Sequence, residues 1–571
     1  MEAKMKGAEA IIKTLCKQGT NVTFGFPGGA VIPLFDKYLD YSDKINNILV
    51  RHEQCAAHAA EGYARASGKV GVCIATSGPG ATNLVTGIMD AYMDSVPLIA
   101  FGGQVPTGLI GNDAFQETDM MGITLPITKH NFQIRDPNEI ESIITKAYKL
   151  ALEGRPGPIY IDLPKDIQVK EITKNKNEVK IRGFSPTVEP NTAQISRAAD
   201  MMMKAEMPLI LAGGGVIASN ASKELKQLAE FTGIPVVTTM MGKSCFDENH
   251  PLSLGTVGMH GRKIANYATL QTDLMIAIGC RFSDRITGNL ESYLEFAKLI
   301  HIDIDPAEIG KNVKADLPVV GDARRTLSSL VVALRNKKWK EKKEWKENMT
   351  VLGKKCDKCI ELKAGKKIFP KEIVTEVNKL LKKGDIITTG VGQHQMFAMH
   401  YLRMGSPRTF ISSGGAGTMG FGLPAAIGAK VAKPNNNVFC FDGDGSFQMT
   451  IQELETIRSH NLKIVPIIFN NSFLGMVRQW LELFHDKRYS QVHLGNEIDF
   501  VKIAKAYHLD GITVERQSEL PDAVKQSINA DKTMVVDVKI EEESNVLPML
   551  PPGGHLKEAF GVCMKSPGKF V

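Results

Sequence analysis

Two short motifs in the last third of the chain constrain the fold more than any other feature. Gly443-Asp444-Gly445 follows an apolar run at 438–441, and Asn470-Asn471 follows another at 464–469, with 24 residues between the motifs. Between them, Thr450 to His460 carries apolar residues at helical spacing, so the pattern predicts strand, helix, strand. Such a crossover brings the carboxyl ends of two parallel strands together. Carboxylate and amide oxygens suit Mg²⁺, so the motifs predict a diphosphate held through a metal ion.

Length and charge narrow the classes of protein. A chain of 571 residues is too long for one core, so about two to four domains are expected. A net charge of +7, partly concentrated in 337–367, gives little reason to expect nucleic acid. No apolar run approaches the roughly 20 residues of a membrane span, and no signal segment precedes the first helical pattern. Nine cysteines in apolar surroundings indicate a reducing compartment, and we expect the cytoplasm.

Apolar strand-like runs alternate with amphipathic helices in three blocks, at residues 1–165, 191–336 and 368–571. This alternation predicts an α/β fold with three doubly wound parallel-sheet domains. A polar stretch from Asp166 to Pro190 indicates one connector, and a lysine-rich stretch to about Lys367 indicates a second that contains a solvated helix. The expected strands are 22–26, 45–50, 70–75, 98–101 and 159–163, then 208–212, 236–239, 274–278 and 299–304, then 386–389, 409–412, 437–441, 463–469 and 534–539.

Three matches to other site motifs are weaker. The run 415–420 fits GxGxxG between a strand and a helix, with Asp442 further on, which taken alone is a dinucleotide fingerprint. The loop from Asp442 to Glu453 resembles a calcium loop, but Phe447 stands where the sharp turn needs glycine. Cys356 and Cys359 form a CxxC with no second pair nearby, in a connector that suits neither zinc nor a redox site.

The first block has its own strand-end features. Glu53 opens the helix that follows the strand at 45–50, and by itself could be an ordinary carboxylate at a helix N-terminus. Glycine-rich turns at 26–30 and 75–83 also end strands, and such turns let a ligand approach backbone N–H groups. Several of them on one sheet edge predict the floor of a pocket.

Taken together, these motifs resemble the acetohydroxyacid synthase family of thiamine diphosphate enzymes. The resemblance spans essentially the whole chain and rests on ordered motifs in every block: RHEQCAAHAAEGYARASG, ATSGPGATN, DAFQE and KHNF, then GMHG, RFSDR and HIDIDPAEIGKN, then SGGAGTMGFGLPAAIGA, GDGSFQM, NNSFLGMVRQW and VLPMLPPGG. It implies an enzyme that decarboxylates pyruvate and joins the two-carbon unit to pyruvate or 2-ketobutyrate in branched-chain amino acid biosynthesis.

The resemblance also implies roles around thiamine diphosphate. Glu53 would hydrogen-bond the aminopyrimidine ring, and Met419 would support the bent cofactor. The metal ligands would be Asp444, Asn471 and the carbonyl of Phe473. The diphosphate would contact Gln393, His394, Gly443, Gly445 and Ser446.

For the substrates, Arg285 would bind the acceptor carboxylate as a bidentate cation, unless it pairs with Asp284. Trp480 would favour 2-ketobutyrate through contact with its extra methyl group. The remaining residues of this pocket would be Gly29, Phe115, Gln116 and Lys129.

The middle block resembles the family's FAD domain, in which the flavin is structural. The residues implied to contact FAD are Gly213, Gly214, Gly258, Met259, His260, Arg281, Asp303 and Asp322. Two positions depart from the family pattern: Leu125 replaces an arginine, and Ser283 replaces an aspartate.

The resemblance implies a homodimer or tetramer whose sites lie between chains, and a possible small regulatory subunit. Alternatives are a catabolic, FAD-free acetolactate synthase or another thiamine-dependent carboligase or oxidase. A nicotinamide dehydrogenase or a noncatalytic nucleotide-binding subunit belongs to a different class.

Overall fold

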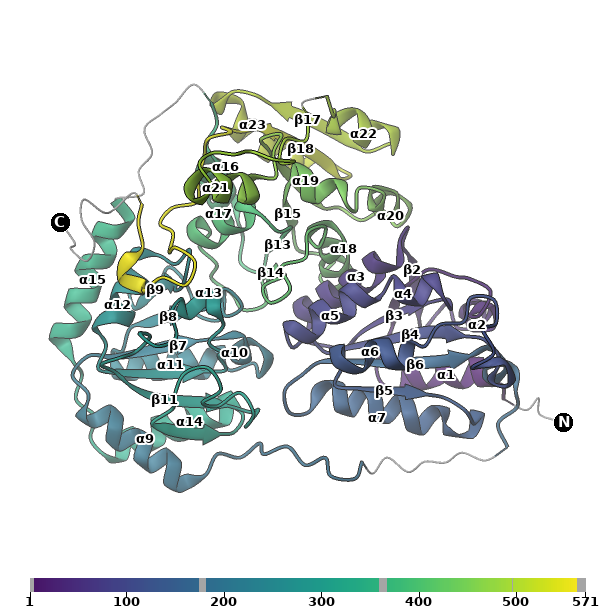
Figure 1. Ribbon diagram of the computed structural model, residues 1–571, viewed down its shortest axis with the longest axis horizontal. Helices are drawn as coiled ribbons and strands as arrows, with labels where there is room; N and C mark the ends of the chain where they lie inside the picture. Colours follow the sequence, from purple (N-terminus) through teal and green to yellow (C-terminus); the bar gives the residue numbers. More distant parts are fainter. Residues whose placement is uncertain (1–4, 174–180, 359–366, 496, 562–571) are drawn as a thin grey trace.

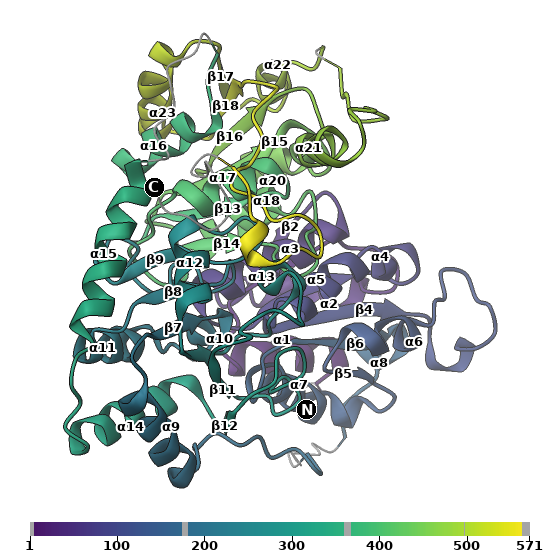
Figure 2. The same cartoon turned by 60° about the vertical axis from the view of Figure 1, so that its left-hand side comes forward.

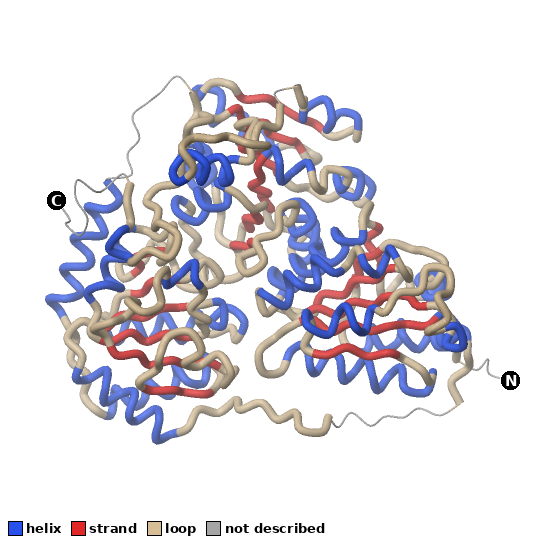
Figure 3. The backbone as a smooth tube through the Cα atoms, viewed as in Figure 1, coloured by secondary structure: helices blue, strands red, loops and turns tan. Residues whose placement is uncertain are grey.

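The computed structural model describes residues 5–173, 181–358, 367–495 and 497–561. Figure 1 shows three lobes in chain order: the first block in purple and blue, the middle block in teal, and the last block in green and yellow. Each contains a six-stranded sheet in which every pairing is parallel. Helices cover both faces of each sheet (Figure 3). The predicted fold class is confirmed.

The first sheet has the order β2-β1-β3-β4-β6-β5. Its four inner strands are wholly buried because their apolar runs are covered on both faces, whereas the edge strands β2 and β5 are partly exposed. The elements are β1 Val22–Gly25, β2 Asn46–Leu49, β3 Gly71–Ala75, β4 Leu98–Gln104, β5 His130–Gln133 and β6 Pro158–Pro164, with α1 Gly7–Lys17, α2 Ile32–Asp40, α3 Glu53–Ser67, α4 Pro79–Thr82, α5 Val85–Met93, α6 Met120–Thr124, α7 Ile140–Leu152 and α8 Lys165–Val169.

The middle sheet has the order β12-β11-β10-β7-β8-β9. Its elements are β7 Pro208–Ala212, β8 Val236–Thr238, β9 Ser253–Thr256, β10 Leu274–Ile278, β11 Lys298–Asp303 and β12 Leu317–Val320, with α9 Thr192–Lys204, α10 Gly214–Ala218, α11 Ser222–Thr232, α12 Lys263–Gln271, α13 Asp284–Thr287, α14 Ala323–Asn336 and α15 Lys343–Lys358.

The last sheet has the order β14-β13-β15-β16-β18-β17. Its elements are β13 Ile386–Thr389, β14 Phe410–Ser412, β15 Val438–Gly443, β16 Val465–Asn470, β17 Asp510–Val514 and β18 Met534–Lys539, with α16 Pro370–Leu380, α17 Gln393–Tyr401, α18 Gly422–Ala432, α19 Asp444–Gln448, α20 Glu453–Ser459, α21 Gly475–Phe484, α22 Phe500–Ala506 and α23 Leu520–Asn529.

The helix expected from Thr450 to His460 is shorter than predicted. It is α20, and a separate short helix, α19, begins directly at Asp444. The second connector also differs from expectation, because α15 is not solvated all round. Its Trp345, Met349 and Cys356 are buried against the middle block, and the indole of Trp345 donates to the carbonyl of Pro208 at 2.9 Å. Cys359, the second cysteine of the CxxC, lies outside the described residues.

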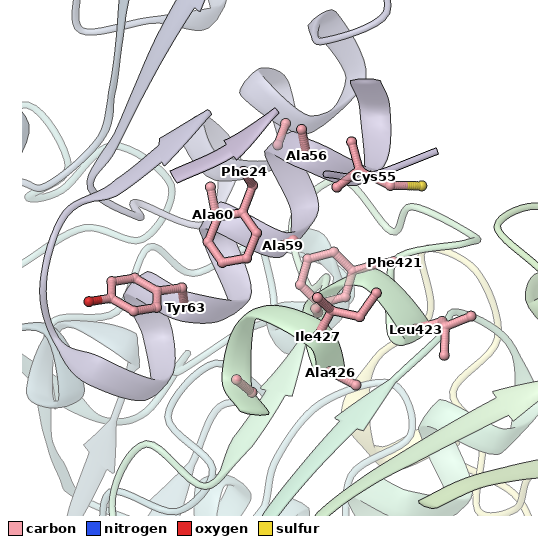
Figure 4. Packing of buried hydrophobic residues seen from close by; sticks show 14 of the residues in the cluster. Phe24, Cys55, Ala56, Ala59, Ala60, Tyr63, Phe421, Leu423, Ala426 and Ile427 are labelled. Carbon is pink, nitrogen blue, oxygen red and sulfur yellow. The ribbon is translucent and has the colours of Figure 1, made fainter. Parts of the chain in front are cut away.

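Long-range contacts tie the blocks together. Helix α3 of the first block crosses α18 of the last block, and their buried side chains belong to one core (Figure 4). The segment after β18 returns to the middle block, where Leu550 N–H donates to the carbonyl of Met259 at 2.8 Å. Figures 1 and 2 show this yellow segment beside α12 and α13. None of the described helices is long and apolar enough to cross a membrane.

Candidate active site

Each sheet has one point at which successive connections leave in opposite directions. These points lie between β1 and β3, between β7 and β10, and between β13 and β15. In open α/β sheets, ligands bind beyond the strand ends at such points. The glycine-rich turns identified in the sequence follow these same strands, so the fold itself selects three candidate crevices.

The last sheet brings the two defining motifs together. Strands β15 and β16 pair in parallel with Gly443 opposite Phe469, so Asp444 and Asn471 both stand just beyond the carboxyl edge. The Asp444 carboxylate accepts hydrogen bonds from the backbone N–H groups of Gly445 and Ser472, and thereby joins the two loops. Burial raises the pKa of Asp444 to about 7, because these contacts only partly offset desolvation.

A pocket opens at this edge. It contains residues of both motifs and of the turn after β13; its lining comprises Val391–His394, Phe397, Met419, Gly443–Ser446, Phe469, Asn471, Phe473–Val477 and Ile540. The Asn471 side-chain oxygen accepts from the N–H of Phe473 at 3.1 Å, which fixes the turn that follows β16. All the residues expected to contact the metal ion or the diphosphate therefore line this one pocket.

Glycines make the walls of this pocket thin. A Cβ at Gly443 would lie 2.8 Å from His394 Nδ1, and a Cβ at Gly445 would lie 2.9 Å from Leu474. A Cβ at Gly475 would lie 2.2 Å from the side-chain oxygen of Gln393. The backbone can thus approach a ligand at positions where any other residue would force neighbouring side chains to move.

The two residues expected at the diphosphate are held differently. Gln393 donates to Gln479 at 2.9 Å and to the carbonyl of Ser544 at 3.0 Å, which anchors the start of α17. His394 is buried, and desolvation lowers its pKa to about 3, so the ring is neutral. Its Nε2 lies 3.6 Å from Asp442.

The GxGxxG run supplies one wall of the pocket. Gly417 and Gly420 have φ values of +68° and +84°, which side chains rarely adopt, so backbone geometry explains these two glycines. The N–H of Gly420 donates to the Ser446 hydroxyl at 3.0 Å, and Met419 lines the pocket between them. The loop that contains Met419 is thus hydrogen-bonded to helix α19, which contains Ser446.

This donor set fits a hard cation and a diphosphate. A buried carboxylate with a raised pKa gains by facing a cation, and the neighbouring amide oxygen and peptide groups are also oxygen ligands. The glycine-lined walls leave room for phosphate oxygens. The residues present are therefore suited to Mg²⁺ and a diphosphate.

Glu53 belongs to a different crevice, at the switch point of the first sheet. It is the first residue of α3, and Asn83 donates to its carboxylate at 2.9 Å. Among the described residues, nothing from the first block lines the pocket that contains Asp444. The start of α3 is instead fixed on α20, because the N–H groups of Arg51 and His52 both donate to Glu453, at 2.9 and 3.1 Å.

The other residues expected near the substrates occupy varied positions in the first block. A Cβ at Gly29 would meet only open space, and Gln116 has a φ of +60° beside Gly78. Phe115 is 88% exposed, on the segment after β4 that projects from the body (Figure 2). Lys129 is turned elsewhere: its ammonium donates to the carbonyls of Leu150 and Glu153 at the end of α7, and burial lowers its pKa to about 8.

Arg285 and Trp480 approach the same boundary between the middle and last blocks. Arg285 is 61% exposed, lies 3.7 Å from Asp284 and contacts Met259 Sδ at 3.3 Å. Trp480 on α21 packs against the cluster that contains Met259 and rests edge-on against Phe484. The alternative ion pair between Arg285 and Asp284 is therefore present, in an exposed form.

The residues expected at FAD surround the switch point of the middle sheet. A Cβ at Gly213 would lie 2.1 Å from the Gly279 carbonyl, so the turns after β7 and β10 touch. Gly258 has a φ of +120° and packs on Arg285, while Met259 and His260 are buried. Arg281 lies three residues beyond the end of β10 and Asp303 ends β11, and burial raises the pKa of Asp303 to about 6. The Asp322 carboxylate caps α14 through the N–H of Arg325 at 3.1 Å.

Two supporting residues were missed in the sequence. Asp442 is fully buried, accepts from the N–H of Gly443 at 3.1 Å and from the Ser446 hydroxyl, and burial raises its pKa to about 7. Glu453 joins α20 to α3 as described above. Both appeared in the sequence only as parts of misleading motifs; Asp442 stands directly before the GDG motif, and Glu453 lies eight residues after it.

Comparison with known families covers all three blocks. Residues 5–123 match the N-terminal TPP binding domain of thiamine pyrophosphate enzymes, residues 195–330 match their central domain, and residues 390–538 match their C-terminal TPP binding domain.

Comparison with individual proteins finds relatives along nearly the entire chain. A probable acetolactate synthase large subunit of Methanocaldococcus jannaschii is 52% identical over 97% of this chain and 94% of its own length. An acetolactate synthase of Mycobacterium bovis is 44% identical over 96% of this chain and 90% of its own length. An acetolactate synthase large subunit of Corynebacterium glutamicum is 44% identical over 96% and 89%, respectively.

Proposed function

This chain belongs to the acetolactate synthase large-subunit family of thiamine diphosphate enzymes, and we propose from this membership and from the pocket that it is an acetolactate synthase. It decarboxylates pyruvate and joins the two-carbon unit to pyruvate or 2-ketobutyrate, for branched-chain amino acid biosynthesis. The observation that carries the proposal is the convergence of Asp444 and the Asn471 loop at one glycine-walled pocket.

The three blocks divide the binding of cofactors. Residues 1–165 bind the pyrimidine of thiamine diphosphate, residues 191–336 bind FAD, and residues 368–571 bind the diphosphate and Mg²⁺. The order of the matched family domains along the chain supports this division. Asp444, Asn471 and the carbonyl of Phe473 hold Mg²⁺, and the peptide groups around Gly443 and Gly445 face the diphosphate.

Bound thiamine diphosphate supplies a carbon nucleophile that adds to keto acids and stabilises negative charge after CO₂ leaves. Glu53 holds a proton at the pyrimidine ring, which requires a carboxyl group shielded from water. Met419 would support the cofactor from the wall of the pocket that it lines. The neutral His394 keeps the diphosphate region free of a competing titratable cation.

The site is completed by a second chain. Glu53 lies outside the Asp444 pocket, so a cofactor that needs both must reach another protomer. Exposed apolar side chains of the first and last blocks support such an interface: Tyr92, Met93, Leu109, Phe115, Ile123, Leu125, Met449 and Val477. An unburied set of this kind is typical of a protein–protein interface. We expect a homodimer or tetramer.

Arg285 binds the carboxylate of the acceptor keto acid, and Trp480 contacts its alkyl end. Both residues contact the cluster that contains Met259, at the boundary between the middle and last blocks. The binding site for the acceptor therefore adjoins the binding site for FAD. Gln116 and Gly29 line the same pocket from the partner's side. Lys129 would have to leave the carbonyls of α7 to join them.

FAD binds at the glycine turns after β7 and β10, with Met259, His260 and Arg281 beside it. The unpartnered Nδ1 of the buried His260 supports a polar ligand there. Leu125 lacks the polar contact with FAD that an arginine would make, and Ser283 replaces an aspartate, so the strength of FAD binding is the property that these two departures affect. A small regulatory subunit is consistent with relatives described as large subunits. Free cysteines suit a cytoplasmic location.

The test is product analysis with pyruvate and 2-ketobutyrate together, in the presence of Mg²⁺ and thiamine diphosphate, with and without FAD. We expect both 2-acetolactate and 2-aceto-2-hydroxybutyrate, with more of each when FAD is present. If the purified protein is colourless and forms the same amount of product with and without FAD, the catabolic alternative is supported instead. Nicotinamide-dependent oxidation without CO₂ release would refute the proposal.

A further inference from the structure

The loop that leads into Met419 is held by the first block of the same chain. This loop, Ser413–Thr418, follows β14 and precedes the residue that lines the cofactor pocket. Two carboxylates at the end of α5, Asp90 and Asp94, lie one helical turn apart and both face it. The loop therefore depends on a helix more than 300 residues away in sequence, since the contacts span 320 to 323 positions.

Asp94 binds the backbone of the loop. One carboxylate oxygen accepts from the N–H of Gly415 at 2.7 Å, and the other accepts from the N–H of Gly414 at 2.9 Å. Arg65 on α3 braces the same carboxylate at 3.2 Å and also pairs with Glu61 at 3.0 Å. Hydrogen bonds from peptide groups to a carboxylate are charge-assisted, and the side chain of Asp94 is fully buried, so they define the loop position strongly.

Asp90 ties the two ends of the loop together. It accepts from the Ser413 hydroxyl at 2.8 Å, and the same hydroxyl accepts from the N–H of Thr418 at 2.9 Å. Thr418 also hydrogen-bonds Asp90 through its side chain. Ser413 thus passes the constraint to the residue directly before Met419.

The surroundings leave little freedom for any other arrangement. A Cβ at Gly414 would lie 2.2 Å from Met241 Sδ of the middle block, and a Cβ at Gly415 would lie 2.9 Å from the Asp94 carboxylate. All three blocks therefore meet at this loop. If the carboxylates were removed, the Ser413 hydroxyl and the N–H groups of Gly414 and Gly415 would lose their partners, and of these contacts that of Ser413 is buried.

We propose that Asp90 and Asp94 are positioning residues that set Met419 for thiamine diphosphate in the site built by the same chain's last block. The inference rests on the proposed function. It gives the first block two separate tasks: Glu53 serves the partner's cofactor, whereas Asp90 and Asp94 order the loop of their own chain. Helix α3 connects both tasks, because it begins at Glu53 and carries Arg65.

The first experiment measures thiamine diphosphate binding by calorimetry, with Mg²⁺ present, for Asp94→Asn, Asp94→Ala and Asp90→Asn. Loss of one charge-assisted contact predicts a dissociation constant raised by about tenfold or more, with Asn milder than Ala because it keeps one oxygen acceptor. Asp40→Ala is the matched control, since Asp40 is an exposed acid of the same block that pairs with Lys37. Far-UV circular dichroism checks that the variants are folded. Unchanged affinity in folded Asp94→Ala would overturn the proposal.

The second experiment separates positioning from general damage. Mixed dimers are formed from a Glu53→Gln chain and an Asp444→Ala chain, which leaves one intact site, built on the last block of the Glu53→Gln chain. Asp94→Asn is then placed on one chain or the other. We expect the KM for thiamine diphosphate to rise only when it is on the Glu53→Gln chain, whose Met419 serves that site.

An equal rise from either chain, or a rise from the Asp444→Ala chain alone, would contradict the proposal. If the parental mixed dimers have no activity, the shared site of the proposed function fails, and the binding affinities of the uniform variants decide the positioning role by themselves.

Discussion

Asp442 and Asp444 show how neighbouring carboxylates in one motif acquire different tasks. Burial raises the pKa of each to about 7. Asp442 is enclosed: a Cβ at Gly390 would lie 1.8 Å from it, and the Ser446 hydroxyl and Gly443 N–H satisfy it. Asp444 lines the pocket and touches the Asn471 loop. The first therefore supports the turn, whereas the second is available to a cation.

Trp480 provides a test of acceptor choice. Replacing Trp480 with Leu removes the flat surface at the alkyl end of the acceptor, worth about 1–3 kcal/mol in discrimination. We expect the preference for 2-ketobutyrate over pyruvate to fall by about tenfold or more, measured as the product ratio with both acids present. Trp339→Leu is the control, because Trp339 packs on the middle block and donates to the Thr232 carbonyl at 2.9 Å. An unchanged product ratio in the Trp480 variant would show that Trp480 does not select the acceptor.

His400 provides a test of pH dependence. Burial, reinforced by nearby His260, Arg262, Lys243 and Arg403, lowers the pKa of His400 from 6.5 to about 3. Below pH 6.5, His400 therefore binds a proton in the unfolded chain but stays neutral in the folded chain. The stability that the neutral His400 contributes is fully present above pH 6.5 and is lost as the pH falls toward 3.

Relative to His400→Gln, the wild type should lose about 1.4 kcal/mol of unfolding free energy for each pH unit below 6.5. Urea titrations between pH 7 and pH 5 measure this difference. His508→Asn, at an exposed position, should show no such divergence from the wild type. Parallel pH profiles for wild type and His400→Gln would show that the ring is not held neutral.

Residue positions were predictable where a motif ends a strand. Asp444 and Asn471 line one pocket, as their spacing across the crossover predicts, and Gln393 and Met419, which the family resemblance implied, line the same pocket. Asp90 and Asp94 could not be found this way, since nothing in a single helix shows that a loop far along the chain will lie against it. The position of Lys129 could not be predicted for the same reason. Its ammonium group donates to carbonyls at the end of α7, and tertiary packing brings these groups together.

At the level of elements, α3 and α18 approach closely because small residues face each other. A Cβ at Gly62 would lie 2.2 Å from the Ala425 carbonyl, and a Cβ at Gly428 would lie 1.8 Å from the Ala59 carbonyl. These are backbone atoms, which cannot rotate aside. Figure 4 shows the two helices crossing side by side.

We therefore expect Gly428→Ala to destabilise the protein by about 1–3 kcal/mol or more through overpacking, even though alanine favours a helix by about 1 kcal/mol. Gly353→Ala is the matched control in α15, because a Cβ there meets nothing within 4 Å. It should be neutral or slightly stabilising. Thermal melting measures the change in melting temperature of each variant, and the two changes should differ in sign. An unchanged melting temperature for Gly428→Ala would mean that the two helices can move apart to accept the methyl group.

The strands absent from the sequence predictions share one position. They are β5, β9, β12 and β17, and each lies at the edge of its sheet. Edge strands of a parallel sheet are covered less completely, and β17 is mostly half-buried or exposed. They consequently lack the continuous apolar runs that identified the central strands.

At the scale of the whole molecule, three sheets with the same parallel architecture each offer one crevice at a switch point. Their order along the chain was predictable from the alternation of strands and helices. The return of residues 546–560 to the middle block was not, because this segment has little periodicity and is ordered by contacts such as that of Leu550 with Met259. This return completes the boundary between the middle and last blocks at which Met259 and Trp480 pack.

The central claim is that the pocket beyond β15 and β16 binds thiamine diphosphate through a cation held by Asp444. Calorimetric titration of thiamine diphosphate into the wild type, Asp444→Ala and the exposed control Asp531→Asn, each with and without Mg²⁺, tests it most directly. We predict tight binding that requires Mg²⁺ in the wild type and the control, weakened by about a hundredfold or more in Asp444→Ala. Binding by Asp444→Ala with unchanged affinity and Mg²⁺ dependence would contradict the account.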